Sequence, residues 1–225
     1  MATYRIALLG DGIIGSWGDC RELHTELKRL YPRTDFEIYN NGRHGSRVGY
    51  GLHRVAKGWE RDGVRVPPLS YDDPHIAIVE SFAYTQRADG PEGLTEYRDA
   101  LRSIWDELAA TTRARRVFAI APPPIRDKYG EGVLELINTS RTLRARMADD
   151  IQLYLDEARR IAHDEGWPMA DVCAEVQKRV KAGEAPRRFV DGSDNIHPSR
   201  YGFVAMAAVL VQTIDEFRII EEPKE

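Results

Sequence analysis

The sequence predicts an α/β protein, a flavodoxin-like three-layer α/β/α sandwich with a five-stranded parallel sheet. Short apolar runs alternate with longer stretches that carry apolar residues at helical spacing, and this alternation indicates strands joined by helices. The runs lack a polar alternation, which is typical of parallel strands covered on both faces. Right-handed crossovers leave few arrangements of such units, and we expect the strand order 2-1-3-4-5.

The first half of the chain holds three of the expected strands. Continuous apolar runs at 6–9 and 76–79 predict two of them, and the segment Phe36-Glu37-Ile38-Tyr39 predicts the other. A leucine stripe predicts a helix at 18–31, which Pro32 ends, and a weaker pattern predicts another at 48–57. Three prolines and the lack of any periodicity predict that 62–74 is a connection between elements.

The second half continues the same alternation. Apolar residues at helical spacing predict a helix at 93–111, and the run at 117–120 predicts a fourth strand, which the prolines at 122–124 end. A long helix is expected at 139–165 and a short fifth strand at 167–172. Two further helices are expected at 174–181 and 199–217.

Composition excludes several classes of protein. The 225 residues include 32 basic and 36 acidic side chains, and the formal charge of −4 argues against nucleic acid as a partner. No apolar run is long enough to span a membrane, and the N-terminal run is too short for a secretion signal, so we expect a cytoplasmic protein. Cys20 and Cys173 are too few for a disulfide framework. They show no metal-ligand spacing with the histidines, so we expect no metal site, and we expect no cofactor.

Candidate functional residues follow the predicted strands, because parallel sheets bind ligands at the carboxyl ends of their strands. Gly10-Asp11-Gly12 follows the first strand, and Asn40-x-Gly42-x-x-Gly45 follows the second. Before the last helix stands Asp194-x-x-His197. A carboxylate beside an imidazole holds its tautomer and stabilises the imidazolium that forms when it takes a proton.

This ordered set of motifs resembles the SGNH hydrolases, also called the GDSL esterases and lipases. The resemblance implies hydrolysis of a small-molecule ester or an acylated carbohydrate, with His197 as the base and Asp194 as the residue that orients it. It also implies that Asp11 braces the neighbouring loops and that Gly45 helps to hold the oxyanion with the amide of residue 12. Asn40, which begins the same block as Gly45, is expected to be a further binding residue. The first and last blocks must meet to form one site, so we expect one domain over 1–220. Separately, we expect a disordered tail at 221–225 and a chain that can form a homo-oligomer.

Two positions depart from the family's pattern. Gly12 stands where the family has its nucleophilic serine, and glycine cannot form an acyl-enzyme. The third block has no asparagine, so Thr85 or Tyr84 is the expected replacement as an oxyanion donor. We therefore expect little or no serine-dependent hydrolysis from the chain as it stands.

Several explanations of Gly12 stay open at this point. The glycine is an inactivating replacement, or it marks a natural pseudo-enzyme that keeps a ligand-binding cleft. Alternatively another group acts, either Ser16, with Ser46 and Ser81 as weaker candidates, or a water activated by His197. The structural alternative for Ser16 is the N-cap of the first helix.

Other residues near these motifs have both a functional and a structural interpretation. Arg43 and His44 can contact an anionic or sugar-like substrate or lie in solvent. Glu80 ends an apolar strand and is either a buried acid with a raised pKa or a structural hydrogen-bond acceptor. Trp17 lines the cleft or packs in the core.

A dinucleotide-binding domain is the main alternative from another class. Gly10-x-Gly12-x-x-Gly15 after a first strand matches the fingerprint of such domains. The acid expected to bind the ribose would be Glu37, but it lies inside the second predicted strand rather than at its end. This alternative also leaves Asp194-x-x-His197 without a role.

Overall fold

A computed structural model describes residues 2–61 and 63–221. Five parallel strands form one sheet in the order β2-β1-β5-β6-β7. They are β1 (Ala2–Gly10), β2 (Thr34–Gly42), β5 (Ile76–Glu80), β6 (Arg115–Ile120) and β7 (Met169–Asp171). Counted along this sheet alone, the order is 2-1-3-4-5, so the predicted fold class and strand order are confirmed.

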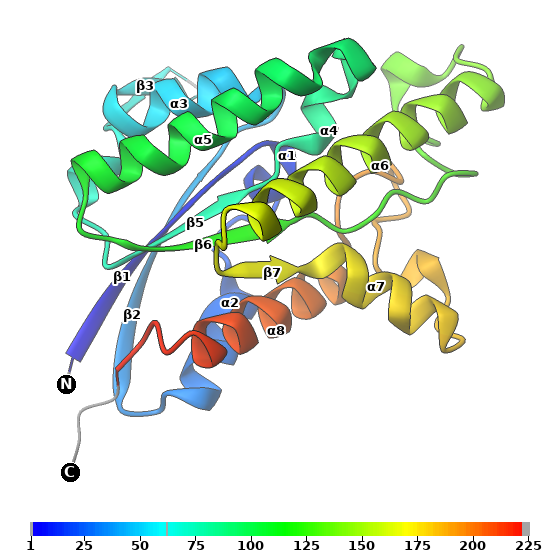
Figure 1. Ribbon diagram of the computed structural model, residues 1–225. Coiled ribbons are helices and arrows are strands. Elements are labelled where there is room, and N and C mark those ends of the chain that lie inside the picture. Colours follow the sequence, from blue (N-terminus) through cyan, green and yellow to red (C-terminus); the bar gives the residue numbers. More distant parts are fainter. Residues whose placement is uncertain (1, 62, 222–225) are drawn as a thin grey trace.

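Helices cover both faces of the sheet, which buries the continuous apolar runs of its central strands β1, β5 and β6. Figure 1 shows α3, α5 and α6 on one face and α2 and α8 on the other, with α7 beside α8. The helices are α1 (Gly12–Gly15), α2 (Arg21–Leu30), α3 (Val48–Ala56), α4 (Ala83–Gln86), α5 (Leu94–Thr111), α6 (Arg141–Asp164), α7 (Val172–Lys181) and α8 (Arg200–Glu216). Every residue of β5 is buried between the two layers.

The segment predicted to be a connection at 62–74 contains regular structure, which corrects that prediction. β3 (Trp59–Arg61) pairs with β4 (Val64–Val66) as an antiparallel hairpin outside the main sheet, and the 3-10 turn η1 (Leu69–Asp72) follows. Gly63 adopts φ +77°, which lets the chain reverse between these two short strands. Strands of three residues are too short to show a periodicity in the sequence.

The first helical region also differs from the prediction. A single turn, α1, follows β1 at once, and α2 begins only at Arg21 because Cys20 adopts a left-handed conformation with φ 53°. Asp11 caps α1 by accepting the amide of Ile13, whereas Ser16 is the C-cap. The predicted N-cap role of Ser16 is therefore wrong. The turn α4 after β5 was likewise not predicted.

Four further 3-10 turns complete the connections. They are η2 (Arg87–Asp89), η3 (Pro91–Gly93), η4 (Leu134–Leu136) and η5 (Pro186–Arg188). At the C-terminus, residues 222–225 of the predicted disordered tail lie outside the described residues. Glu221 is described, and its amide donates to the hydroxyl of Tyr4 at 3.2 Å. Within the described part of the chain, no helix is long and apolar enough to cross a membrane.

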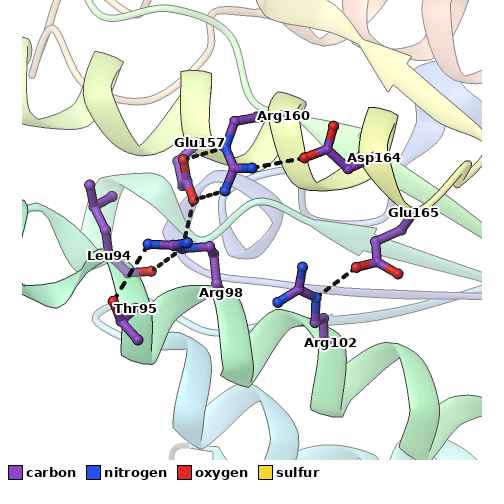
Figure 2. Close-up of polar contacts among 8 residues, drawn as sticks. All are labelled: Leu94, Thr95, Arg98, Arg102, Glu157, Arg160, Asp164 and Glu165. Carbon is purple, nitrogen blue, oxygen red and sulfur yellow. Dashed lines mark hydrogen bonds and ion pairs between the residues drawn. The ribbon is translucent and has the colours of Figure 1, made fainter.

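Ion pairs join the two long helices on one face of the sheet (Figure 2). Arg98 of α5 lies 2.8 Å from the carboxylate of Glu157 on α6, and Arg160 lies 2.7 Å from the same carboxylate. The side chain of Glu157 is only 12% exposed, so it is screened from water more than the other groups of this network. The hydrogen bond from Arg160 lowers the pKa of Glu157, and the charges of Arg160 and Arg98 act in the same direction.

Candidate active site

The loop before α8 places Asp194 against His197. Asp194 Oδ2 lies 2.6 Å from His197 Nδ1, and Asp194 Oδ1 accepts the amides of Ile196 at 2.8 Å and of His197 at 3.0 Å. A carboxylate on Nδ1 holds the proton of the neutral imidazole on that nitrogen, so Nε2 keeps its lone pair. Both side chains are about one quarter exposed, at 26% and 27%. The pair predicted from the sequence is therefore formed, with Nε2 in the form that accepts a proton.

Backbone contacts on both sides hold this loop in place. Asn195 adopts φ 54°, and its side-chain amide donates to the carbonyl of Glu131 at 2.8 Å. The amide of Asp191 donates to the carbonyl of His197 at 2.8 Å. Ser199 then caps α8 by accepting the amide of Gly202 at 3.0 Å. The imidazole is thus carried between a turn and a capped helix.

Gly12 lies under two imidazole rings. A Cβ atom added to Gly12 would lie 3.1 Å from His197 Nε2 and 3.0 Å from His44 Nδ1. The first block and the last block of the sequence therefore meet, as the resemblance requires. Gly12 has no left-handed conformation, so its backbone accepts a side chain, although both rings would have to yield by a few tenths of an ångström.

Two amides lie at the positions where the resemblance expects oxyanion donors. Gly12 is the first residue of α1, so its N–H has no partner within the helix. Gly45 adopts φ 68°, and a Cβ built on it would meet nothing within 4 Å. Among the described residues, no acceptor takes the N–H of Gly12 or of Gly45. Both amides are free to donate to a bound ligand.

Asp11 and Thr85 connect three loops beneath Gly12. The buried Asp11 accepts the amide of Ile13 at 2.8 Å and contacts the Thr85 hydroxyl at 3.2 Å. The same hydroxyl lies 2.8 Å from the carbonyl oxygen of Ser46. Because this is the shorter contact, the hydroxyl donates its one proton to that carbonyl. Thr85 therefore braces the loops and cannot also donate to an oxyanion, which corrects its expected role. Tyr84 is excluded for the same reason, because its buried hydroxyl donates to the carbonyl of Pro122 at 2.9 Å.

Asn40 and Ser16 also use their polar groups within the protein. The Asn40 amide donates to the carbonyls of Ile14 and Gly18, both at 2.9 Å, and its oxygen accepts the amide of Gly42 at 2.8 Å. Asn40 thus positions the loop and is not a ligand-binding group, contrary to expectation. Ser16 Oγ donates to the carbonyl of Ile13 at 3.0 Å, at the far end of α1 from Gly12. This geometry does not support Ser16 as an alternative nucleophile.

Glu80 is a buried hydrogen-bond acceptor at the end of β5, as its structural interpretation predicted. Its carboxyl group accepts the Ser81 hydroxyl at 2.6 Å, the Phe82 amide at 2.9 Å and the Asp11 amide at 3.2 Å. Burial raises the pKa of Glu80 well above its ordinary value, and the charge of Asp11 adds to this effect. Burial likewise raises the pKa of Asp11. Glu80 therefore supports the loop that carries Asp11 and does not reach a ligand.

Arg54 is a functional neighbour that the sequence did not predict. Its guanidinium is fully buried and donates to the carbonyl of Gly10 at 2.9 Å, to the hydroxyl of Ser46 at 2.8 Å and to the carbonyl of Asn41. It therefore ties the ends of β1 and β2 to the loop that carries Gly45. The one signal in the sequence was an arginine on the otherwise apolar side of the helix at 48–57.

The remaining candidates are structural. Trp17 is buried, stacks on Phe203 with ring centroids 5.2 Å apart and donates to Glu22, so it packs in the core. Cys20 and Cys173 are free and buried, and burial raises the pKa of these thiols to about 12 and about 11. No group of three or more potential metal ligands occurs among His, Cys, Asp and Glu of the described residues.

The geometry around Gly10-x-Gly12-x-x-Gly15 bears on the dinucleotide alternative. The helix that opens there, α1, has four residues, and a dinucleotide fingerprint needs a full helix whose N-terminus faces the pyrophosphate. Gly10 is needed for packing, because a Cβ there would lie 2.4 Å from the Ile14 side chain. Glu37 accepts the hydroxyl of Tyr39 at 2.9 Å. These features do not favour nucleotide binding.

Comparisons with known proteins support the fold. No protein-family model matches the sequence, and no curated protein matches it significantly. Among solved structures, a lipase/acylhydrolase from Enterococcus faecalis is similar, with a TM-score of 0.71 and 13% identity over 99% of this chain and 100% of that one. An acetylxylan esterase from Geobacillus stearothermophilus has a TM-score of 0.64 and 18% identity, over 94% of each chain. A GDSL-like lipase from Bacteroides thetaiotaomicron has a TM-score of 0.63 and 14% identity, over 95% of this chain and 89% of that one.

Proposed function

We propose that this chain, which has the fold of the SGNH hydrolases, carries the site of an ester hydrolase in which Gly12 occupies the position of the nucleophile. Asp194 and His197 would form the base half of the site, and the amides of Gly12 and Gly45 would hold the oxyanion. Without a hydroxyl at residue 12, no acyl-enzyme can form. The chain as it stands would then bind an ester and show little or no hydrolysis that depends on a serine.

One observation carries this proposal. His197 Nε2 lies 3.1 Å from the point where the Cβ of residue 12 would stand, and Nδ1 of the same ring is held by Asp194 at 2.6 Å. A serine hydroxyl at that position would reach Nε2 by rotation about one bond. His197 would take the hydroxyl proton as the oxygen attacks the ester carbonyl, and would return the proton to the leaving alkoxide.

The experiment is to restore the hydroxyl. We expect Gly12→Ser to hydrolyse p-nitrophenyl acetate at least about a hundredfold faster than Gly12→Ala, because acid–base catalysis typically contributes about 10² to 10⁴ in rate. Gly12→Ala is the matched control, since it adds the same Cβ and pushes on the same two imidazoles without a nucleophile. Intact mass spectrometry of the Gly12→Ser variant should show an added acetyl group during turnover.

Two further variants connect this activity to the Asp194–His197 pair. In the Gly12→Ser background, His197→Ala should return the rate to that of Gly12→Ala, and Asp194→Asn should lower kcat by about 10² to 10⁴ because the imidazole loses its tautomer. A folded Gly12→Ser protein that neither hydrolyses nor becomes acetylated would refute the hydrolase site. It would favour the non-catalytic ligand-binding alternative.

A second route is favoured by the position of His44. Its Nδ1 and His197 Nε2 both border the space on the Cβ side of Gly12, and the two rings meet edge to face with centroids 5.2 Å apart. Partial burial lowers the pKa of His44, and the neighbouring His197 acts in the same direction, which favours the neutral form of the His44 ring. A water there could pass a proton to His197 Nε2 while its oxygen attacks the ester, with no covalent intermediate.

The two routes give different kinetics. In the water route the unaltered chain hydrolyses p-nitrophenyl acetate without an initial burst and without an acetylated intermediate, and His197→Ala abolishes that activity. If the unaltered chain and His197→Ala hydrolyse the ester equally slowly, the water route is wrong.

The proposed function also includes a substrate class, a cellular location and expected partners. A small-molecule ester or an acylated carbohydrate is the proposed substrate, and one of the similar structures is called an acetylxylan esterase. A cytoplasmic location, the formation of a homo-oligomer and the lack of nucleic-acid and membrane partners stay predictions from the sequence.

A further inference from the structure

A cavity whose lining includes His44 lies beside the two imidazole rings at Gly12. The cavity has a volume of about 350 Å³ and lies between the end of β2 and the β3–β4 hairpin. It is lined by Gly15, Gly42, Arg43, His44, Trp59, Glu60 and Arg61. Because His44 Nδ1 faces Gly12 while the residue also lines this cavity, a ligand that fills it would lie beside the proposed ester position.

Three guanidinium groups surround the ring of Trp59. The Cζ atoms of Arg61, Arg54 and Arg43 lie 4.9, 5.3 and 5.7 Å from a ring centroid of Trp59. Arg43 also lies 4.7 Å over the ring of Tyr50. Cation–π contacts of this kind hold the arginines near one another without neutralising their charge.

The charges of these arginines are not balanced within the described part of the chain. None of its carboxylates lies within 4.0 Å of a nitrogen of Arg43, Arg54 or Arg61, although Glu60 lines the cavity. Burial lowers the pKa of Arg54 to about 10, and the charges of Arg43 and Arg61 contribute to the same shift. Like charges gathered without a counter-charge favour the binding of an anion.

The arginines also differ in how much of their hydrogen-bonding capacity is in use. One nitrogen of Arg61 donates to the carbonyls of Asn40 at 3.0 Å and of Gly42 at 2.8 Å, which fixes the guanidinium at the cavity. Arg43 makes no side-chain hydrogen bond to a described residue, so all five of its donors are available. A planar guanidinium with free donors is suited to carboxylate and phosphate oxygens.

The ring of Trp59 is not available for a sugar to stack on. Trp59 is only 4% exposed, because the guanidinium groups and the hairpin cover it. The surface that a ligand would meet is therefore cationic rather than aromatic.

We propose that this cavity binds an anionic group of the substrate, a carboxylate or phosphate, with Arg43 and Arg61 as its ligands and the ester lying over Gly12. This inference rests on the proposed function and names the substrate class of the same site. The anion would neutralise the charge that the arginine cluster leaves unbalanced, and it would orient the ester toward His197.

Binding to the unaltered chain, measured by isothermal titration calorimetry, tests the inference without any need for catalysis. The probes are monomethyl succinate, which is an ester with a carboxylate, and dimethyl succinate, which is its neutral counterpart. We expect the charged ester to bind at least about tenfold more tightly, as one charge-assisted hydrogen-bonded contact would provide. Inorganic phosphate should compete with monomethyl succinate.

Variants assign the effect to the cavity. Arg43→Gln should lower the affinity for monomethyl succinate about tenfold, and Arg43→Lys should retain part of it because the charge remains. Arg65→Gln is the matched control, since Arg65 is exposed on the same hairpin and does not line the cavity. Equal affinity for the two esters would overturn the inference, even if phosphate binds. So would an Arg43→Gln variant with unchanged affinity, or an equal loss in Arg65→Gln.

The two proposals can fail separately. If Gly12→Ser hydrolyses p-nitrophenyl acetate but the unaltered chain does not distinguish the two succinate esters, only the anion site is wrong. If Gly12→Ser is inert but the preference for monomethyl succinate depends on Arg43, the hydrolase site is wrong and the anion site stands.

Discussion

Replacing Glu80 by glutamine tests whether the site is built on a protonated carboxyl group. Glu80 is fully buried and accepts hydrogen bonds from Ser81, Phe82 and the amide of Asp11. Its pKa is raised well above the ordinary value of 4.5, first by burial and then by the charge of Asp11. The folded protein therefore keeps this proton at a pH where the unfolded chain has released it.

The sign and size of the effect follow from proton linkage. Above pH 4.5 the unfolded state binds fewer protons at Glu80 than the folded state, so the free energy of unfolding falls as the pH rises. The slope is about 1.4 kcal/mol per pH unit for one proton, and it continues up to the folded-state pKa. From about pH 5 upward, this residue lowers the free energy of unfolding by about 1.4 kcal/mol for each pH unit that lies below its raised folded-state pKa.

The assay is urea denaturation of the unaltered chain and of Glu80→Gln across this pH range. Glutamine does not titrate, so the variant should lose the part of the slope that belongs to Glu80. Its amide cannot accept the hydrogen bond from Asp11, and this lowers stability by about 1 kcal/mol at every pH. The slope is therefore the decisive quantity. Glu60→Gln is the control, because Glu60 is exposed. If Glu80→Gln and the unaltered chain show parallel curves, Glu80 is not protonated in the folded state.

Two further predictions concern packing and the ion pairs. Gly42→Ala should lower the free energy of unfolding by more than about 3 kcal/mol, because the new Cβ would lie 2.2 Å from the backbone nitrogen of Gly15. In contrast, Gly49→Ala in α3 should raise it by roughly 0.5 to 1 kcal/mol, since open space surrounds that position; similar denaturation midpoints for the two variants would contradict this reasoning. Glu157→Gln should cost about 1 kcal/mol and Glu165→Gln less than about 0.5 kcal/mol, because Glu157 joins two arginines and is 12% exposed whereas Glu165 is 37% exposed. Equal losses in the last two variants, measured by urea denaturation, would show that burial does not strengthen this network.

Contacts between residues close in the sequence could be predicted, whereas contacts between distant segments could not. Asp194 and His197 are three residues apart, so a turn of the backbone brings them together, and their pairing could be predicted. Thr85 and Asn40 were assigned to ligand binding from their places after strands. Their hydrogen-bond partners come from other loops, such as the carbonyl of Ser46 for Thr85 and that of Ile14 for Asn40. No local pattern in the sequence shows such partners.

The sequence by itself determined the layers and the strand order, because continuous apolar runs must be buried on both faces and the helices between them must cover the sheet. It also determined which loops would gather at one edge, since the carboxyl ends of parallel strands share that edge. Only the tertiary structure decided what surrounds Gly12. The approach of His44, the buried guanidinium of Arg54 and the arginines around Trp59 all depend on contacts between separate segments. The partners of each of these side chains are charges, carbonyls or rings from other segments. Only folding brings those groups within a few ångströms of one another.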